Sequence, residues 1–241
     1  MKAAFYAGMT GLTAHQTAMD SIGNNLANLQ TSGYKTEEVS FQSLLYDDMY
    51  ANTDTNPLTG YGVRAVSQGV NFSQGELKST SGALDFAIEG SGLFAVQTGG
   101  RIGYTRGGDF GISMDGTTPY LTTATGAYVL NRNGQRIQIP YKADSTIDTD
   151  AIKAQLGLFT FRNPDALTPG ANGVYTANAQ SGAAQAAAAG STIRSGALEL
   201  SGTSALDEMT DLIRVQRGYQ ICARVLQTAD ENEQTVNNLR K

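Results

Sequence analysis

The residues of this sequence that could carry chemistry are few and widely separated. His15 is the one histidine and Cys222 the one cysteine among 241 residues, so a histidine dyad, an internal disulfide and a Cys/His metal cluster are excluded. We interpret His15 as a packed imidazole and Cys222 as a small apolar residue on a helix. The run Gly90-Ser91-Gly92 lacks the third glycine and the following helix of a phosphate-binding loop, which favours a hairpin turn.

The charged residues form no arrangement typical of catalysis. Carboxylates are spread over predicted turns and helix surfaces, and Asp207, Glu208 and Asp211 fall on the first turns of a predicted helix, where the helix dipole favours them. The sequence leaves a paired-carboxylate site open, although no spacing indicates one. Arg64 and Arg106 could bind a ligand, but ion pairs are the commoner use of such residues. We therefore predict no catalytic residue, no cofactor and no metal, with an enzyme using scattered carboxylates as a minor alternative.

Composition excludes several classes of partner. Charged residues make up 16 % of the chain, against roughly 25 % in ordinary soluble domains, and 28 glycines and many neutral polar residues replace them. Such a surface suits a subunit packed against neighbours. The net charge is −5 without a basic run, so no nucleic-acid partner is expected. The sequence has no apolar run long enough to predict membrane insertion, and its start lacks a Sec-type apolar core. If the protein leaves the cytoplasm, we therefore expect a route that does not cleave a signal peptide.

Both ends of the chain carry the pattern of helices that need a partner. Apolar or helix-compatible residues recur at gaps of three and four near the start (Leu12, His15, Met19, Ile22, Leu26, Leu29) and near the end (Leu212, Val215, Tyr219, Cys222, Leu226, Ala229, Val236). This repeat makes a narrow seam typical of a coiled coil. It predicts helices over residues 2–29 and 205–239, the second capped by Ser204 and about 50 Å long. Three glycines weaken the first helix, so both helices are expected to order only when neighbours bury them.

The middle of the chain reads as a glycine-rich antiparallel β-domain. Short apolar or alternating segments, each closed by a glycine-containing turn, are predicted strands: residues 84–88, 93–98, 101–106, 109–113, 120–123, 127–131, 155–161 and 195–200. A polar loop is predicted at 51–62 and a surface loop at 177–190. The predicted fold class is therefore α+β. Residues 1–35 and 200–241 form one inner coiled-coil domain, 36–62 a connecting segment and loop, and 63–199 the central β-domain.

Several segments resemble, in order, the bacterial flagellar basal-body rod and hook protein family. The segments that carry the resemblance are Gly23-Asn24-Asn25-Leu26-Ala27-Asn28 with Thr31-Ser32-Gly33-Tyr34-Lys35, residues 81–94, residues 104–110, residues 195–199, Glu208-Met209, and Gln216-Arg217-Gly218-Tyr219 through residues 227–230. Together they span most of the chain. Residues 10–17 and 41–46 look closest to the distal rod member, with the proximal rod member as runner-up.

The resemblance implies a polymerising, non-enzymatic subunit of the flagellar basal body, outside the cytoplasmic membrane. Its terminal helices would line a central channel, its β-domain would form the outer layer, and the hollow tube would link the motor to the hook and transmit torque. The implied partners are other copies of the chain, neighbouring rod and hook subunits, and the flagellar type III export apparatus. The candidate assembly interface comprises Leu12, Met19, Ile22, Asn24, Asn25, Leu26, Asn28, Leu212, Val215, Tyr219, Leu226 and Ala229.

Two other kinds of protein fit the same sequence. A proximal rod or hook-like axial subunit would share the helices, although a typical hook subunit carries an extra outer domain. A secreted adhesin-like or glycan-binding β-protein with helical flanks belongs to a different class. That protein would be fully folded as a monomer, whereas a rod subunit would leave its helical seams to be covered by neighbours.

Overall fold

The computed structural model describes residues 2–48, 58–142, 146–187 and 190–239, and it divides the chain into two compact units. The helical unit combines both ends of the chain with residues 37–68, and the β-unit combines residues 28–36 with residues 69–203. The connecting segment predicted at 36–62 thus contributes strands to the helical unit. The fold is α+β, with terminal helices and a central antiparallel β-region, as the sequence predicted.

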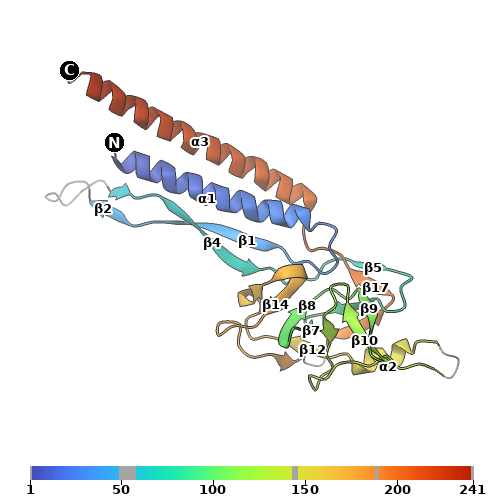
Figure 1. Cartoon of the computed structure of the whole chain (residues 1–241). Helices are drawn as coiled ribbons and strands as arrows, with labels where there is room; N and C mark the ends of the chain where they lie inside the picture. Colours follow the sequence, from blue (N-terminus) through green and yellow to red (C-terminus); the bar gives the residue numbers. More distant parts are fainter. Residues whose placement is uncertain (1, 49–57, 143–145, 188–189, 240–241) are drawn as a thin grey trace. The chain divides into compact units, whose positions relative to one another are not determined.

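The helical unit is built on two long helices, α1 (Lys2–Ala27) and α3 (Ala205–Asn238). Figure 1 shows them side by side, with the end of α3 extending past the start of α1. Ser204 caps α3, because its side chain accepts a hydrogen bond from the backbone N–H of Asp207 at 3.4 Å, as predicted. The observed helix bounds agree with the predicted ranges to within two residues.

Two strand pairs complete the helical unit. A long pair joins β1 (Glu37–Ser43) to β4 (Val63–Val70), and a short pair joins β2 (Tyr46–Asp48) to β3 (Leu58–Gly60). In Figure 1 the β1–β4 pair runs alongside α1, and β1 contacts that helix. The polar loop predicted at 51–62 lies outside the described residues as far as residue 57, and β3 occupies most of the remainder.

The β-unit is organised around one antiparallel sheet. In the described chain this sheet runs in the order β13-β14-β8-β7-β11-β10-β9, with β12 also pairing to β7 and to β15. Its strands are β7 (Leu93–Thr98), β8 (Arg101–Thr105), β9 (Phe110–Asp115), β10 (Thr118–Thr123), β11 (Tyr128–Val129), β12 (Leu158–Thr160), β13 (Thr168–Pro169), β14 (Val174–Thr176) and β15 (Gln185–Ala186). Gly99 and Gly100 close the β7–β8 hairpin with φ of +55° and +84°, which glycine adopts without strain.

Shorter pairs flank the main sheet. They join β5 (Leu77–Ser79) to β17 (Ala197–Glu199) and β6 (Phe86–Glu89) to β16 (Thr192–Ser195). Helix α2 (Thr149–Gln155) and two 3₁₀ turns (Pro164–Ala166, Ala171–Gly173) lie between strands.

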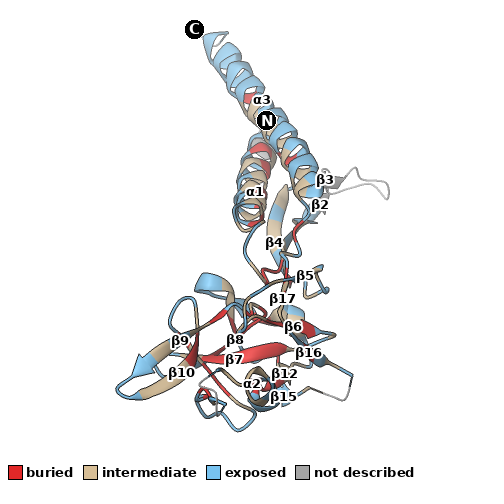
Figure 2. Cartoon of the chain, turned by 90° about the vertical axis from the view of Figure 1, so that its right-hand side faces the viewer, coloured by how far each residue is buried: buried red, intermediate tan, exposed pale blue. Residues whose placement is uncertain are grey.

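Strand β7 is the centre of the packed core. Phe94 and Val96 belong to one buried cluster, and Leu93 and Ala95 belong to another. Side chains alternate between the faces of a strand, so β7 is covered on both faces. Figure 2 shows β7 as a buried element. The continuous apolar run that predicted this strand reflects its double burial.

Two predictions from the sequence were wrong. Gly90-Ser91-Gly92 does not close a hairpin, because β6 pairs with β16 while β7 pairs with β8, β11 and β12. The run is instead a bend between two sheets. The strand predicted at 155–161 begins only at Leu158, because residues 149–155 form α2, whose start is capped by Asp148 accepting from the N–H of Ala151 at 3.1 Å. A seven-residue helix with one buried side chain carries too little periodicity to be detected.

Candidate functional site

Small residues form the closest contact between the two long helices. The buried positions of α1 include Gly8, Gly11, Ala14 and Ala18. A Cβ added at Gly11 would lie 2.8 Å from the Sγ atom of Cys222, and one added at Gly8 would lie 3.3 Å from Leu226. The helices therefore pack antiparallel and approach closely because these positions lack larger side chains.

The side chain of His15 fills the seam farther along the same pair. A Cβ added at Gly218 of α3 would lie 2.5 Å from His15 Cε1, and the ring of Phe41 in β1 lies 5.1 Å from the imidazole on another side. Among the described residues, His15 Nδ1 is buried without a hydrogen-bond partner. His15 is thus a packed ring between two helices and a strand, as interpreted from the sequence. Cys222 is half-buried on α3 with a free thiol.

The predicted interface residues flank this seam more often than they form it. Half-buried members are Leu12, Met19, Ile22, Leu26, Asn28, Leu212, Tyr219 and Leu226, buried members are Asn25, Val215 and Ala229, and Asn24 is exposed. The apolar pattern selected positions with large side chains. The buried positions Gly11, Ala14 and Ala18 of α1 carry small residues, and each stands one residue before a position of that pattern. None of these positions is shown to contact another copy, so their role in assembly stays a prediction.

Asn25 joins three elements of the helical unit. Its side chain is 2 % exposed. The Nδ2 group donates to the carbonyl oxygen of Glu37 at 3.1 Å and to Glu208 Oε1 at 3.0 Å, while Oδ1 accepts from the N–H of Glu37 at 3.1 Å. Ser21 also donates to the Glu37 carbonyl oxygen, at 3.2 Å. One amide therefore ties the end of α1 to the start of β1 and the first turn of α3.

The carboxyl group of Glu208 lies in an acidic neighbourhood. Burial raises its pKa above the ordinary value, and the charges of Asp211, Asp207 and Glu38 raise it further. The hydrogen bond from Asn25 acts in the opposite direction. Deprotonation of Glu208 therefore costs this junction some stability.

Helix α3 carries several large apolar side chains that are exposed. Its large exposed side chains are Leu206, Met209, Ile213, Ile221, Val225 and Val236, and we name this set the exposed apolar face. Ile213 stands two residues before the buried Val215, which places it about 200° around the helix. Every described residue from Asp230 to the end of α3 is exposed, as Figure 2 shows. The last turns of α3 therefore carry one exposed apolar side chain, Val236, among polar residues.

A groove lies where the end of α3 extends past the start of α1. It has a volume of about 470 Å³ and is lined by Ala4, Ile221, Arg224, Val225, Thr228, Ala229 and Asn232. Most of the lining comes from α3, and Ile221 and Val225 belong to the exposed apolar face. The groove thus continues that face onto the side of the helix pair.

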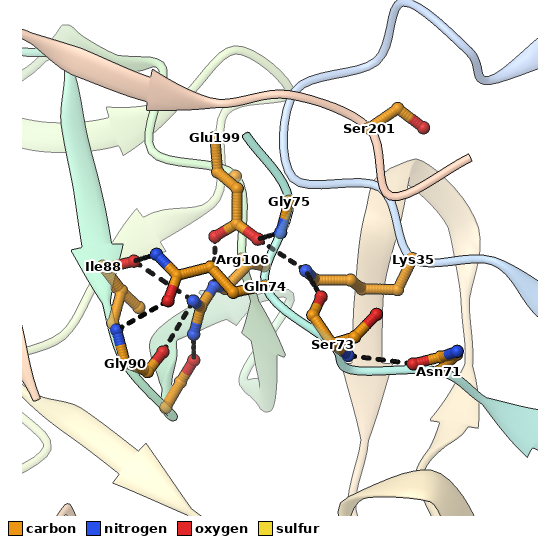
Figure 3. A network of polar contacts seen from close by, with 12 residues as sticks. Lys35, Asn71, Ser73, Gln74, Gly75, Ile88, Gly90, Arg106, Glu199 and Ser201 are labelled. Atoms are coloured by element: carbon orange, nitrogen blue, oxygen red, sulfur yellow. Dashed lines mark hydrogen bonds and ion pairs between the residues drawn. The ribbon is translucent and has the colours of Figure 1, made fainter. Parts of the chain in front are cut away.

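A buried ion network holds the β-unit together at the ends of its outer segments. Glu199 Oε1 lies 2.5 Å from Lys35 Nζ, and Glu199 Oε2 lies 2.5 Å from Arg106 Nε. The side chains of all three are at most 3 % exposed. Figure 3 shows the Glu199 carboxylate between the two cations. Residues from the segment after α1, the end of β8 and strand β17 thus meet at one carboxylate.

Backbone groups satisfy the remaining donors and acceptors of this network. Arg106 donates to the carbonyl oxygens of Gly92 at 2.5 Å, Gly90 at 2.7 Å and Ile88 at 3.1 Å. Lys35 also donates to the carbonyl oxygen of Ser73 at 2.6 Å, and Glu199 Oε1 accepts from the N–H of Gly75 at 2.8 Å (Figure 3). Three carbonyl contacts place Arg106 inside the bend between β6 and β7, which explains the ordered conformation of that bend.

Burial and charge act against each other in this network. Burial opposes ionisation of Glu199, but Arg106, Lys35 and the Gly75 N–H together hold the pKa of its carboxyl below the ordinary value. Burial lowers the pKa of the Lys35 ammonium, and its bond to Glu199 opposes that shift. Two cations around one anion leave a net positive charge in the core. Removal of the anion is therefore expected to be costly.

Sequence reasoning found one member of the network. Arg106 was expected to serve in an ion pair, whereas Lys35 and Glu199 were not singled out. The pattern gave no signal at Glu199, because it alternates with Leu198 and Leu200 and would by that alternation face away from the core. The structure instead buries Glu199, and a buried charge requires partners such as Lys35 and Arg106. Arg64, by contrast, is exposed and donates to Gln42 Oε1 at 3.1 Å.

Within the described ranges, the structure contains no group of three or more His, Cys, Asp or Glu side chains arranged to hold a metal ion. Over the same ranges, no helix has the length and apolarity needed to span a membrane. What the geometry does provide is a helix pair with an uncovered apolar side and a β-unit whose outer segments are fixed by buried charge.

Comparison with known proteins gives matches along the chain. Three family models match: flagella basal body rod protein over residues 5–35, flagellar hook protein FlgE/F/G D1 domain over residues 87–152, and flagellar basal body rod FlgEFG protein C-terminal over residues 194–239. The flagellar basal-body rod protein FlgG of Bacillus subtilis (strain 168) is 34 % identical, with 100 % of each chain covered. FlgG of Borreliella burgdorferi is 30 % identical over 100 % of each chain. The rod protein FlgF of Caulobacter vibrioides is 30 % identical, covering 100 % of this chain and 99 % of its own.

Proposed function

The chain belongs to the flagellar basal-body rod protein family, and we propose that it is a structural subunit that polymerises into the rod. In this proposal the subunits form a hollow axial tube that links the motor to the hook and transmits torque. Full-length similarity to rod proteins named FlgG, at 34 % and 30 % identity, supports the rod and favours its distal part. The similar identity to a FlgF keeps the proximal rod as the second assignment.

The observation that carries the proposal is the exposed apolar face of α3. Full burial of one Leu, Ile, Val or Met side chain stabilises an assembly by roughly 1.5–3 kcal/mol. Six such residues lie on the face, between 41 % and 77 % exposed, so covering them is a substantial driving force. The groove beside Ala4 and Val225 extends the apolar surface. A helix pair of a second copy has the length and the matching apolar side to cover both.

In the proposed assembly, the exposed apolar face of one copy contacts a different surface of the next copy. If the exposed apolar face of one copy packs against the other side of the next helix pair, the contact is heterologous and does not close on itself. Repeating such a contact builds a helical tube. The helices would lie inside the tube, where the low charge of the chain is least costly.

The buried network around Glu199 gives this subunit a route for mechanical load. Lys35 lies on the segment that follows α1, and Glu199 lies on the segment that precedes α3. Glu199 pairs with Lys35 and also with Arg106, which lies at the end of the central hairpin. Force applied to either helix would thus reach the core of the β-unit through charge-assisted hydrogen bonds instead of through a flexible linker.

The partners and location follow from the rod assignment. We expect contacts with other copies, with neighbouring rod and hook subunits and with the flagellar type III export apparatus. We expect the subunit to act in the basal body outside the cytoplasmic membrane, after export without a cleaved signal peptide. It is expected to act as a structural component without catalytic activity.

The test is assembly of the purified chain with the apolar face altered. Ile213→Glu combined with Ile221→Glu places two charges on the face without touching the α1 seam, so we expect normal folding and loss of polymers. Gln216→Glu is the matched control, because Gln216 is exposed on the same helix and the change adds charge without removing apolar area. Sedimentation and electron microscopy at high protein concentration measure the outcome. Polymers that form equally well from the double variant would exclude this face as the assembly surface.

A further inference from the structure

A polar groove in the β-unit has the chemistry of a ligand site. It has a volume of about 750 Å³, within the range of roughly 300–1,000 Å³ found for ligand pockets. Its lining is Gln97, Tyr120, Asn131, Gly134, Gln135, Arg136, Gln138, Ile139, Pro140 and Gln155. Five side-chain amides thus converge on one hollow, together with a phenol and a guanidinium, and none of the lining residues is a carboxylate. Nothing in the proposed assembly of the helices uses these residues.

The rim of the groove is held in place by Arg136. Its Cζ atom lies 4.1 Å from the centre of the Tyr128 ring, which meets the Tyr120 ring edge-on at 5.8 Å. Arg136 Nε also donates to Gln97 Oε1 at 3.3 Å, and a guanidinium nitrogen contacts Asp115 at 3.5 Å. The guanidinium has further N–H groups to offer, and the amide NH₂ of Gln97 keeps both of its donors. Asp115 balances the charge of Arg136, so the groove presents mainly the dipoles of its side-chain amides and little net charge.

Two further glutamines of the lining, Gln138 and Gln155, have side chains that are free to bind a ligand. Gln138 and Gln155 are exposed, and neither side chain makes a hydrogen bond within the described chain. The apolar residues of the lining are Ile139, which is 5 % exposed, and Pro140, which is half-buried. An amide offers a donor and an acceptor side by side, which matches neighbouring hydroxyl groups on a sugar ring. The apolar surface that Pro140 exposes matches the C–H face of the same ring.

We propose that this groove binds a neutral oligosaccharide through the amides of Gln97, Gln138 and Gln155. An anionic ligand is disfavoured because the one cation in the lining is already balanced by Asp115. An extended peptide is disfavoured because the backbones beside the groove are already paired, Tyr120 with Gln138 and Asn131 with Leu156, which leaves no free strand edge for β-addition. All the lining residues belong to the β-unit, so sugar binding can be tested independently of the assembly of the helices.

The test is a titration of the full-length monomeric chain, followed by NMR, with three probes. These are a tetramer of N-acetylglucosamine, a tetramer of glucose and a neutral capped tetra-alanine peptide. We expect saturable binding of at least one sugar with a Kd on the order of 1 mM. The two sugars separate a ligand recognised through its N-acetyl group from one recognised through hydroxyls. Binding of the peptide without either sugar would overturn the proposal, as would binding of none of the three.

Variants locate the binding. Gln138→Ala with Gln155→Ala should weaken sugar binding at least about fivefold, since each loses hydrogen bonds to the ligand. The thermal stability of this double variant should be unchanged, because both side chains are exposed. Gln185→Ala, an exposed glutamine of β15 outside the groove, is the matched control and should bind as the unaltered chain does. Equal binding by both variants would place the sugar elsewhere and contradict the proposal.

Discussion

At the scale of single residues, Glu199 is the group on which the β-unit depends most. Its carboxylate is the shared partner of two buried cations and also accepts from a backbone N–H. Replacement with a neutral side chain leaves Lys35 and Arg106 as uncompensated buried charges. Burial alone opposes all three charges, so the network is stable only while it is complete.

We predict that Glu199→Gln lowers the free energy of unfolding by about 3–5 kcal/mol. The control is Asp115→Asn, which breaks the exposed pair with Arg136 at 3.5 Å and should cost less than about 1 kcal/mol. Urea unfolding of both variants measures the difference. Equal effects of the two substitutions would show that the buried network contributes no more than a surface ion pair.

The lowered pKa of Glu199 also predicts the response to acid. A carboxyl whose folded pKa lies below its unfolded value of about 4.5 contributes stability above that pH, and the contribution is lost as the pH falls toward the folded pKa. We therefore expect the unaltered chain to lose stability below about pH 4.5 more steeply than Glu199→Gln does. Parallel acid limbs for the two chains would contradict the assignment.

Glu208 predicts the opposite slope at higher pH. Its raised pKa means that the folded state holds the proton more tightly, so stability should rise as the pH falls from 8 toward the unfolded value near 4.5. Asp109, whose pKa is raised by its own burial, adds a slope of the same sign, so the comparison is with Glu208→Gln. The variant should show a shallower rise in urea-unfolding titrations over this range. An unchanged slope would show that Glu208 titrates normally.

At the scale of elements, the helix pair shows what an apolar pattern can and cannot identify. The gaps of three and four predicted both helices to within two residues and placed Val215 and Ala229 in the seam. They missed the closest contacts, because Gly8, Gly11 and Ala18 carry little or no side chain for a hydrophobic pattern to register. A small-residue seam is visible in a sequence only when the partner helix is already known.

Two glycine substitutions in this pair should change stability in opposite directions. Gly218→Ala places a methyl group 2.5 Å from His15, whose ring is backed by Phe41, and should cost about 1–3 kcal/mol. Gly23→Ala, in the same helix pair, meets nothing within 4 Å and should stabilise by up to about 1 kcal/mol. Chemical unfolding followed by circular dichroism measures both. Stabilisation by Gly218→Ala would show that His15 moves freely and does not hold the helices.

The sequence predicted strands well where the strand, its turn and its pairing partner are neighbours along the chain. Leu93–Thr98 and Arg101–Thr105 are joined by two glycines at positive φ, and the pattern located both strands and the turn. The pairing of β6 with β16 could not be read locally, because its partners are about one hundred residues apart. Likewise β1 and β4 were missed as a pair, since each strand is half-exposed and lacks a clean alternation.

At the scale of the whole molecule, the features that matter for the proposed function are the apolar surfaces that a single chain leaves exposed. The exposed apolar face and the last turns of α3 find no cover within the described chain. The sequence predicted an end helix about 50 Å long, and the structure pairs that helix of 34 residues with a helix of 26 residues. Which copy covers the difference depends on contacts between chains, and a single sequence does not encode them in any local pattern.

A chain that ends at Ala229 tests the role of the uncovered turns. The removed part of α3 has no buried described residue, so we expect an unchanged melting temperature and a circular dichroism spectrum that loses only the signal of the deleted turns. Polymerisation should fail, because part of the apolar face and of the groove is gone. Polymers of normal length from the shortened chain would show that these turns are dispensable for assembly.

Isolated basal bodies show whether this chain is a component of the rod. The measurement is electron microscopy and mass spectrometry of basal bodies from the bacterium of origin, with the gene intact and with it deleted. We expect the chain to co-purify with basal bodies and its deletion to leave a shortened rod without a hook. Complete basal bodies with attached hooks in the deletion strain would contradict it.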